Sequence, residues 1–93
     1  MIIEFSWGTG KMSVDAEGLI LGMPMANFKK WVKLFAKYGE PADHEAFLQL
    51  LEDQIQVNKQ AIKEELDEKE LPPLRRMLKR RLSMRDQLKG CLS

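Results

Sequence analysis

The chain has one cysteine, one histidine and no apolar segment long enough to cross a bilayer. A lone Cys91 excludes an intramolecular disulfide and is typical of a reducing compartment. The first residues lack the basic and apolar regions of a secretory signal, so we expect a cytoplasmic protein without a membrane association. His44 and Cys91 together are too few for the usual zinc-site composition, and we expect no metal and no cofactor.

Catalytic motifs are equally scarce. The segment Gly8-Thr9-Gly10-Lys11 ends like a phosphate-binding loop, but Phe5 stands where that loop needs its first glycine. Met12 also replaces the hydroxyl that would bind magnesium. A flexible turn is the better interpretation. Since His44 and Cys91 lack a third group to orient them as a nucleophilic pair, we expect no enzymatic activity.

The composition is that of a small globular domain, and the patterning described below makes it α+β. Its 93 residues are 44% hydrophobic and 31% charged, which predicts one folded domain rather than a disordered chain. We expect residues 1–40 to form a base of strands and one helix. Residues 41–93 are expected to form a helical hairpin.

The N-terminal segment is patterned as β-structure. Ile3, Phe5 and Trp7 alternate with more polar positions, as in a half-buried strand. Residues 15–18 have the Asp and Gly preferences of a type I turn, and Leu19-Ile20-Leu21 then resembles a short strand. The pattern predicts a three-stranded antiparallel meander over about residues 2–21. So small a sheet needs a helix over one face.

Three helices are predicted after the meander. Apolar residues at i, i+3, i+4 and i+7 indicate a helix over about residues 24–38, formed by Phe28, Trp31, Val32 and Phe35. A second helix is expected over about residues 43–69, with Asp43 as its N-cap. Pro72-Pro73 separates it from a third helix over about residues 73–89, and a tight turn makes the two antiparallel neighbours.

The net charge of +1 hides a strong asymmetry. Residues 42–70 carry a net charge of −6 and residues 71–93 carry +6, so an acidic block, EELDEKE, precedes a basic one, LRRMLKRRLSMR. Because the blocks meet at the turn, we expect most of these charges to neutralise one another across the hairpin.

A polar layer is expected inside the hairpin. On helical spacing, Asn58 lies within the apolar seam of the second helix, and Arg81 and Arg85 lie within the apolar face of the third. We expect Arg81 to pair with Glu65 and Arg85 to bond Asn58, since a buried unpaired charge is costly.

Two surfaces are candidates for binding. The first is an outward basic ridge that could bind a protein partner or phosphates, formed by Arg75, Arg76, Lys79 and Arg80. Lysines on the first helix could add a second positive surface: Lys29, Lys30, Lys33 and Lys37. The other candidate is a weaker stripe that is either a partner or dimer surface or is covered by the fold, formed by Leu50, Gln54, Val57 and Ala61.

These features favour a small non-enzymatic protein-interaction module, in the sense of an adaptor, regulator or inhibitor. It would present the helical hairpin to a protein partner, for example one in nucleic-acid machinery. The alternative is a nucleic-acid-binding protein that contacts phosphates through the basic third helix. A homodimer is a further alternative.

Overall fold

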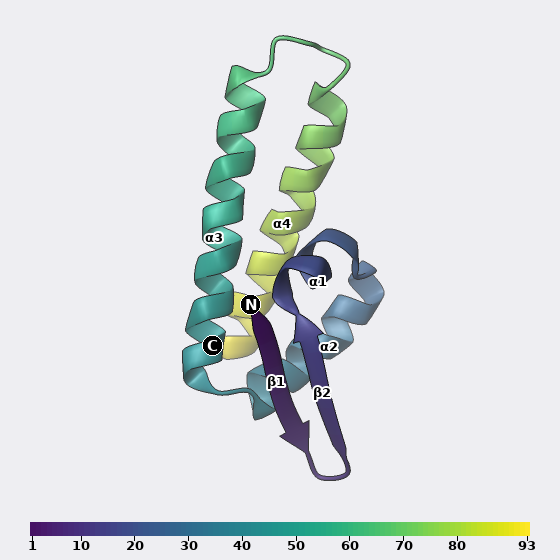
Figure 1. The fold of residues 1–93 in the computed structure, drawn as a ribbon, viewed down its shortest axis with the longest axis vertical. Coiled ribbons are helices and arrows are strands. Elements are labelled where there is room, and N and C mark those ends of the chain that lie inside the picture. The colour runs from purple at the N-terminus through teal and green to yellow at the C-terminus, as the bar shows by residue number, and fades with distance from the viewer.

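The computed structural model describes all 93 residues and contains one two-stranded sheet and four helices (Figure 1). In chain order the elements are β1 (Ile2–Trp7), β2 (Gly10–Asp15), α1 (Ala16–Gly22), α2 (Met25–Tyr38), α3 (Pro41–Glu64) and α4 (Leu71–Leu92). The molecule is 50 Å long and 22 Å across. No helix combines the length and the apolar character needed to cross a lipid bilayer.

The α+β class is as predicted, but the prediction of a third strand is wrong. Residues 19–21 belong to helix α1, and the sheet is a hairpin of β1 and β2 alone, with Ile3 opposite Val14 and Phe5 opposite Met12. Ala16, Leu19 and Ile20 are buried, at helical positions i, i+3 and i+4. Buried and exposed residues do not alternate here as they would in a strand, since the neighbours Leu19 and Ile20 are both buried.

Helix α2 covers the inner face of the sheet, as predicted. Its rings lie between the sheet and α3: Trp31 contacts Phe5 with ring centroids 6.1 Å apart and Phe47 with centroids 5.6 Å apart. Phe35 makes the same two contacts, each with centroids 5.8 Å apart. Such aromatic pairs add to the hydrophobic stabilisation that burial of the rings supplies.

The C-terminal end of α2 is held by a side chain from the next helix. The Nε2 atom of His44 donates a hydrogen bond to the Phe35 carbonyl at 2.7 Å, and the ring stands edge-on to the Phe35 ring. The backbone N–H of Gly39 donates to the same carbonyl. The only histidine therefore stabilises a helix end.

The two long helices lie side by side and extend well past the rest of the fold (Figure 1). The sheet, α1, α2 and the adjoining parts of α3 and α4 form a body. Residues 56–80 form what we call the arm: the end of α3, the loop of residues 65–70 and the start of α4. Fully buried apolar side chains of α3 end at Ile55 and those of α4 begin at Met84, so the arm adds little to the core.

The boundaries of the hairpin differ from those predicted. Helix α3 begins at Pro41 with Glu40 in the N-cap position, rather than at Asp43, and ends at Glu64 rather than near residue 69. Acidic side chains are unfavourable at a helix C-terminus, which favours unwinding of the acidic segment there. Helix α4 begins at Leu71, and its two prolines occupy the first turn, where no backbone donor is needed.

Candidate interaction surfaces

Arg80 does not belong to the outward ridge in which the sequence pattern places it. Its Nε donates to the Ile20 carbonyl at 2.8 Å, and its Nη2 donates to the carbonyls of Leu19, at 3.2 Å, and of Met23. These three carbonyls are at the C-terminal end of α1, where a helix has unpaired acceptors and a partial negative charge. Arg80 therefore fastens α1 to α4.

The polar layer in the hairpin exists, but its partners differ from those predicted. Asn58 is buried; its Nδ2 donates to the Leu74 carbonyl at 3.0 Å, and its Oδ1 accepts from Nη1 of Arg81 at 2.7 Å. Glu65, the expected partner of Arg81, instead accepts a bond from the backbone N–H of Asp67. Burial, and secondarily the charge of Arg80, lowers the pKa of Arg81 from its usual value.

Arg85 pairs with Glu52 rather than with Asn58. Its Nε lies 3.7 Å from Oε1 of Glu52, and Nζ of Lys89 lies at the same distance from that oxygen. The predicted place of Arg85 beside Asn58 is taken by Arg81, which lies one helical turn earlier on α4. The pairing is shifted because the helices are joined by a six-residue loop instead of a tight turn.

The predicted neutralisation of the acidic block by the basic block is not seen. The four ion pairs of the structure join Met1 to Asp15, Arg85 to Glu52 and Asp86, and Lys89 to Glu52. None of them involves residues 64–70 or the basic ridge. The acidic end of the arm and the remaining basic side chains are therefore separate charged surfaces.

Three residues of the predicted ridge are exposed and form no ion pair or side-chain hydrogen bond: Arg75, Arg76 and Lys79. The four lysines of α2 are exposed as well, and Nζ of Lys37 lies 5.2 Å from the centroid of the Tyr38 ring. The sequence pattern places all four ridge residues outward, and three of the four are exposed in the structure. It had no signal for Arg80, whose contacts lie about 60 residues away in sequence.

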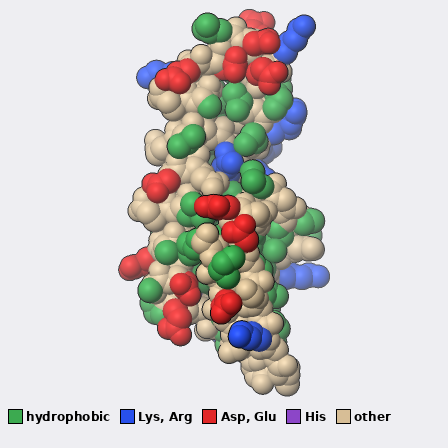
Figure 2. All heavy atoms as spheres, viewed as in Figure 1, with side chains coloured by type: hydrophobic (Ala, Val, Ile, Leu, Met, Phe, Trp, Pro, Cys, Tyr) green, Lys and Arg blue, Asp and Glu red, His purple; other side chains and the backbone are tan.

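The loop at the end of the arm carries an exposed leucine among acidic residues. Leu66 is 97% exposed, and Figure 2 shows the acidic side chains that gather at this end of the molecule. The loop is ordered by its own bonds: the N–H of Asp67 donates to Oε1 of Glu65, and the N–H of Lys69 donates to Oδ1 of Asp67, both at 2.9 Å. We call residues 64–70 the tip.

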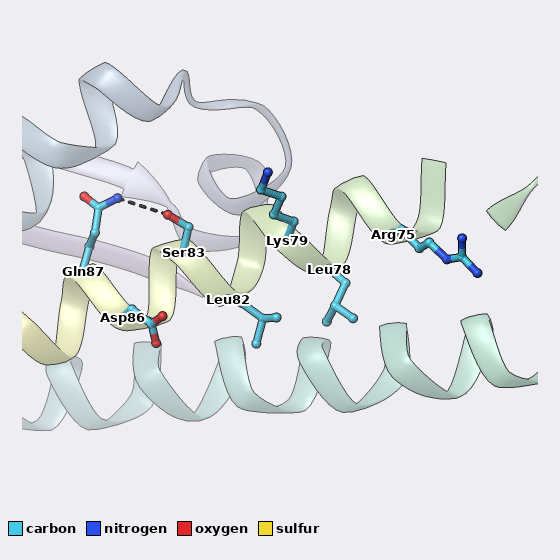
Figure 3. Close-up of a pocket in the computed structure, with 7 residues that line it drawn as sticks. All are labelled: Arg75, Leu78, Lys79, Leu82, Ser83, Asp86 and Gln87. Carbon is cyan, nitrogen blue, oxygen red and sulfur yellow. Dashed lines mark hydrogen bonds between the residues drawn. The ribbon is translucent and has the colours of Figure 1, made fainter. Parts of the chain in front are cut away.

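A shallow groove of about 560 Å³ runs along the outer surface of α4 (Figure 3). All of its lining residues come from this helix: Arg75, Leu78, Lys79, Leu82, Ser83, Asp86 and Gln87. Leu78, Leu82 and Asp86 project from one side of the helix, and Lys79, Ser83 and Gln87 from the other (Figure 3). The sequence pattern had indicated the basic residues here but not the leucines between them.

The second predicted stripe is divided between the body and the arm. In the body, Leu50 packs on the core and Gln54 is half-buried; in the arm, Ala61 is half-buried and Val57 is 70% exposed. The two residues weighed as a nucleophilic pair both pack in the body, since Cys91 contacts the core cluster and His44 bonds α2.

Comparisons of this chain with protein-family models, with curated proteins and with solved structures find no match.

Proposed function

We propose that this protein is a small non-enzymatic protein-interaction module, an adaptor, regulator or inhibitor, that presents the tip of its α3–α4 hairpin to a protein partner. The observation that carries the proposal is the 97% exposure of Leu66 at the end of an arm that projects from the body. The lone Cys91 supports a cytoplasmic setting, where a free thiol stays reduced.

The arm extends beyond the part of the hairpin that packs in the core. An isolated exposed leucine is ordinary on a protein surface. Here, however, the chain extends two helices beyond the last buried core residues and places that leucine at their junction, in a loop fixed by hydrogen bonds. Transfer of a fully exposed leucine into a partner's pocket stabilises a complex by roughly 1.5–3 kcal/mol. Because the loop is ordered before binding, little entropy is lost.

The charge of the tip defines the partner's chemistry. The tip contains five acids and one lysine, and none of the acids forms an ion pair. An apolar pocket with a basic rim would complement this surface and would be steered toward it at low ionic strength. A protein that binds nucleic acid has such basic surfaces, which is consistent with a partner in nucleic-acid machinery.

The second candidate function is direct binding of nucleic acid through Arg75, Arg76 and Lys79. The observation that favours it is that these three cations are exposed and unpaired. Two observations weigh against it. Arg80 is engaged with α1, and the acidic tip directly precedes the basic residues and repels phosphates.

The test is a pull-down from a lysate of the source cells, with tagged wild-type protein and two matched variants. Leu66→Ser removes the exposed side chain at the tip, and Val57→Ser removes a comparably exposed side chain on the side of α3. We expect a specific protein to be retained by the wild type and by Val57→Ser but lost with Leu66→Ser. Neither substitution should change the stability by more than about 0.5 kcal/mol.

Nuclease treatment and salt separate the two functions. Retention that survives nuclease and requires Leu66 supports the protein partner. Retention that disappears with nuclease, falls steeply between ~50 and ~200 mM salt and requires Arg75, Arg76 and Lys79 would instead establish nucleic-acid binding. Identical retention by wild type and Leu66→Ser would contradict the proposed role of the tip.

A further inference from the structure

A small hollow lies where helix α1 packs against α4, at the base of the arm (Figure 1). We call the five residues that line it the corner: Ile20, Leu21, Met77, Arg80 and Arg81. The hollow has a volume of about 30 Å³, which accommodates about two water-sized atoms. It therefore suits one small polar group of a larger partner, such as the two oxygens of a carboxylate.

The corner holds two positive charges and no negative one. Arg80 is engaged, because its donors bind the carbonyls at the end of α1. Arg81 makes a single hydrogen bond, from Nη1 to Asn58, and forms no ion pair. Its Nε and Nη2 atoms have no partner in the protein and are accessible to solvent. Burial, and secondarily the charge of Arg80, lowers the pKa of Arg81, as expected for a guanidinium without a carboxylate beside it.

Apolar side chains that face solvent border this cation. Leu21 is 67% exposed and Met77 is 38% exposed, and both line the hollow together with Arg81. A desolvated guanidinium without a counter-ion is unfavourable, and a carboxylate from outside would relieve this by pairing with it. Apolar groups next to that carboxylate would cover Leu21 and Met77, which adds hydrophobic stabilisation.

We propose that the corner binds an acidic segment of a partner protein, in which an Asp or Glu pairs with Arg81 and an apolar neighbour covers Leu21 and Met77. The free Nε and Nη2 lie on one edge of the planar guanidinium, an arrangement that binds both oxygens of a carboxylate. Residues 71–93 carry a net charge of +6, so α4 attracts an acidic segment. No residue of the corner belongs to the tip, so this is a second binding site.

The chemistry of the corner favours an acidic, apolar peptide over other occupants. A nucleic acid would supply an anion, but its phosphate backbone has no apolar group to cover Leu21 and Met77. The tip of a second copy carries Leu66 among acids. However, the two carboxylates that flank this leucine, those of Glu65 and Asp67, already accept bonds from N–H groups of the loop. A separate partner with an uncommitted carboxylate is therefore the better match.

The experiment is a selection of short random peptides from a displayed library on the immobilised full chain, with counter-selection on Arg81→Gln. Glutamine removes the charge but keeps a donor for Asn58, so the polar layer is preserved. Enriched peptides should carry an Asp or Glu close to a Leu, Ile, Met or Phe. A synthetic copy of such a peptide should bind Arg81→Gln at least about tenfold more weakly than the wild type. Arg81→Lys keeps the charge and should bind with intermediate affinity.

Matched apolar variants map the rest of the site. Met77→Ser should weaken peptide binding at least about threefold, whereas Leu92→Ser, equally exposed at 38%, should bind like the wild type. Leu21→Ser should also weaken binding, and its control is Ile2→Ser, since Ile2 is 61% exposed on β1. Leu66→Ser should leave peptide binding unchanged, which distinguishes this site from the tip. Circular dichroism checks that each variant is folded.

Peptides that share a carboxylate and require Arg81, Leu21 and Met77 support the proposal. Failure to enrich any peptide over the counter-selection, enrichment of peptides without an acid, or equal binding by the wild type and Met77→Ser would each overturn it. Loss of peptide binding in Leu66→Ser would do the same, because the peptide would then occupy the tip. Self-association of the chain that is lost in both Arg81→Gln and Leu66→Ser would make a second copy the occupant and would also overturn the proposal.

Discussion

Replacing Arg80 with Met should lower the free energy of unfolding by about 2–4 kcal/mol, because the guanidinium is the only group that binds the C-terminal carbonyls of α1 from another element. Methionine keeps the apolar stem of the side chain and removes its donors. The substitution therefore isolates the hydrogen bonds from the packing.

The magnitude follows from the geometry. Arg80 makes three hydrogen bonds, and a bond from a charged donor contributes roughly 1.5–3 kcal/mol. The Leu19 carbonyl also accepts from the backbone N–H of Met23, so it stays partly satisfied in the variant. Two of the three share the Nη2 atom, so their contributions are not additive. Leu21 and Gly22 are exposed, so water can reach the end of α1 in the variant and recover part of the loss. These corrections reduce the sum of the three bonds to about 2–4 kcal/mol.

Urea unfolding followed by circular dichroism measures this loss, and amide hydrogen exchange locates it. For a domain of this size each kcal/mol lowers the Tm by roughly 4–8 °C. Exchange should accelerate most at the amides of α1. Arg76→Met, four positions earlier on the same helix and free of hydrogen bonds, is the matched control and should cost less than about 0.5 kcal/mol.

Arg80→Lys provides a further comparison. A lysine keeps the charge near the helix end but cannot span three carbonyls as a planar guanidinium does. We expect its stability to lie between those of the wild type and Arg80→Met. If Arg80→Met and Arg76→Met had equal stabilities, and α1 exchanged no faster in the former, the assigned role of Arg80 would be refuted.

Three further predictions concern the hairpin and the body. Asn58→Ala should lower the free energy of unfolding by about 2–3 kcal/mol in urea, since it leaves the Arg81 guanidinium without its acceptor. The loss should be smaller when the substitution is made in an Arg81→Met background, and equal losses in both backgrounds would argue against the bond. Gly39→Ala should destabilise the fold by about 1–3 kcal/mol, because the new Cβ would lie 2.6 Å from the backbone oxygen and from a ring carbon of Phe35. Gly90→Ala is the control: no atom lies near its new Cβ, and it should stabilise the fold by up to about 1 kcal/mol. Glu52→Gln should cost about 0.5–1 kcal/mol at low salt and progressively less as salt is added, and a salt-independent cost would show that its two ion pairs are not the cause.

The sequence predicts those parts of this fold whose signal is local. The apolar spacing of Phe28, Trp31, Val32 and Phe35 identifies α2 almost to the residue, because each position is buried in the way its period requires. The alternation in β1 is equally clear, since one face of the hairpin is buried and the other is solvated.

The remaining features depend on contacts between distant segments. Residues 19–21 are too few to distinguish a strand from a helix, and the group that stabilises α1 as a helix is Arg80. The partners in the polar layer depend on where α3 ends, and an end displaced by about one turn gives every pair a new partner. On the candidate surface, helical spacing identifies Arg75, Arg76 and Lys79 as outward, but a charge run alone does not reveal which cation is bound elsewhere.

The link between Arg80 and α1 also constrains the order of folding. A helix of seven residues is not stable in isolation, and its cap comes from 57 to 61 positions further along the chain. The β-hairpin and α2 can form from near neighbours, whereas α1 gains its C-terminal cap only after α4 has docked on the body. Contacts that form after the transition state affect mainly the rate of unfolding. Loss of the Arg80 guanidinium should therefore accelerate unfolding and leave the refolding rate nearly unchanged. This side chain would then contribute to the kinetic stability of the folded protein and not to its rate of folding.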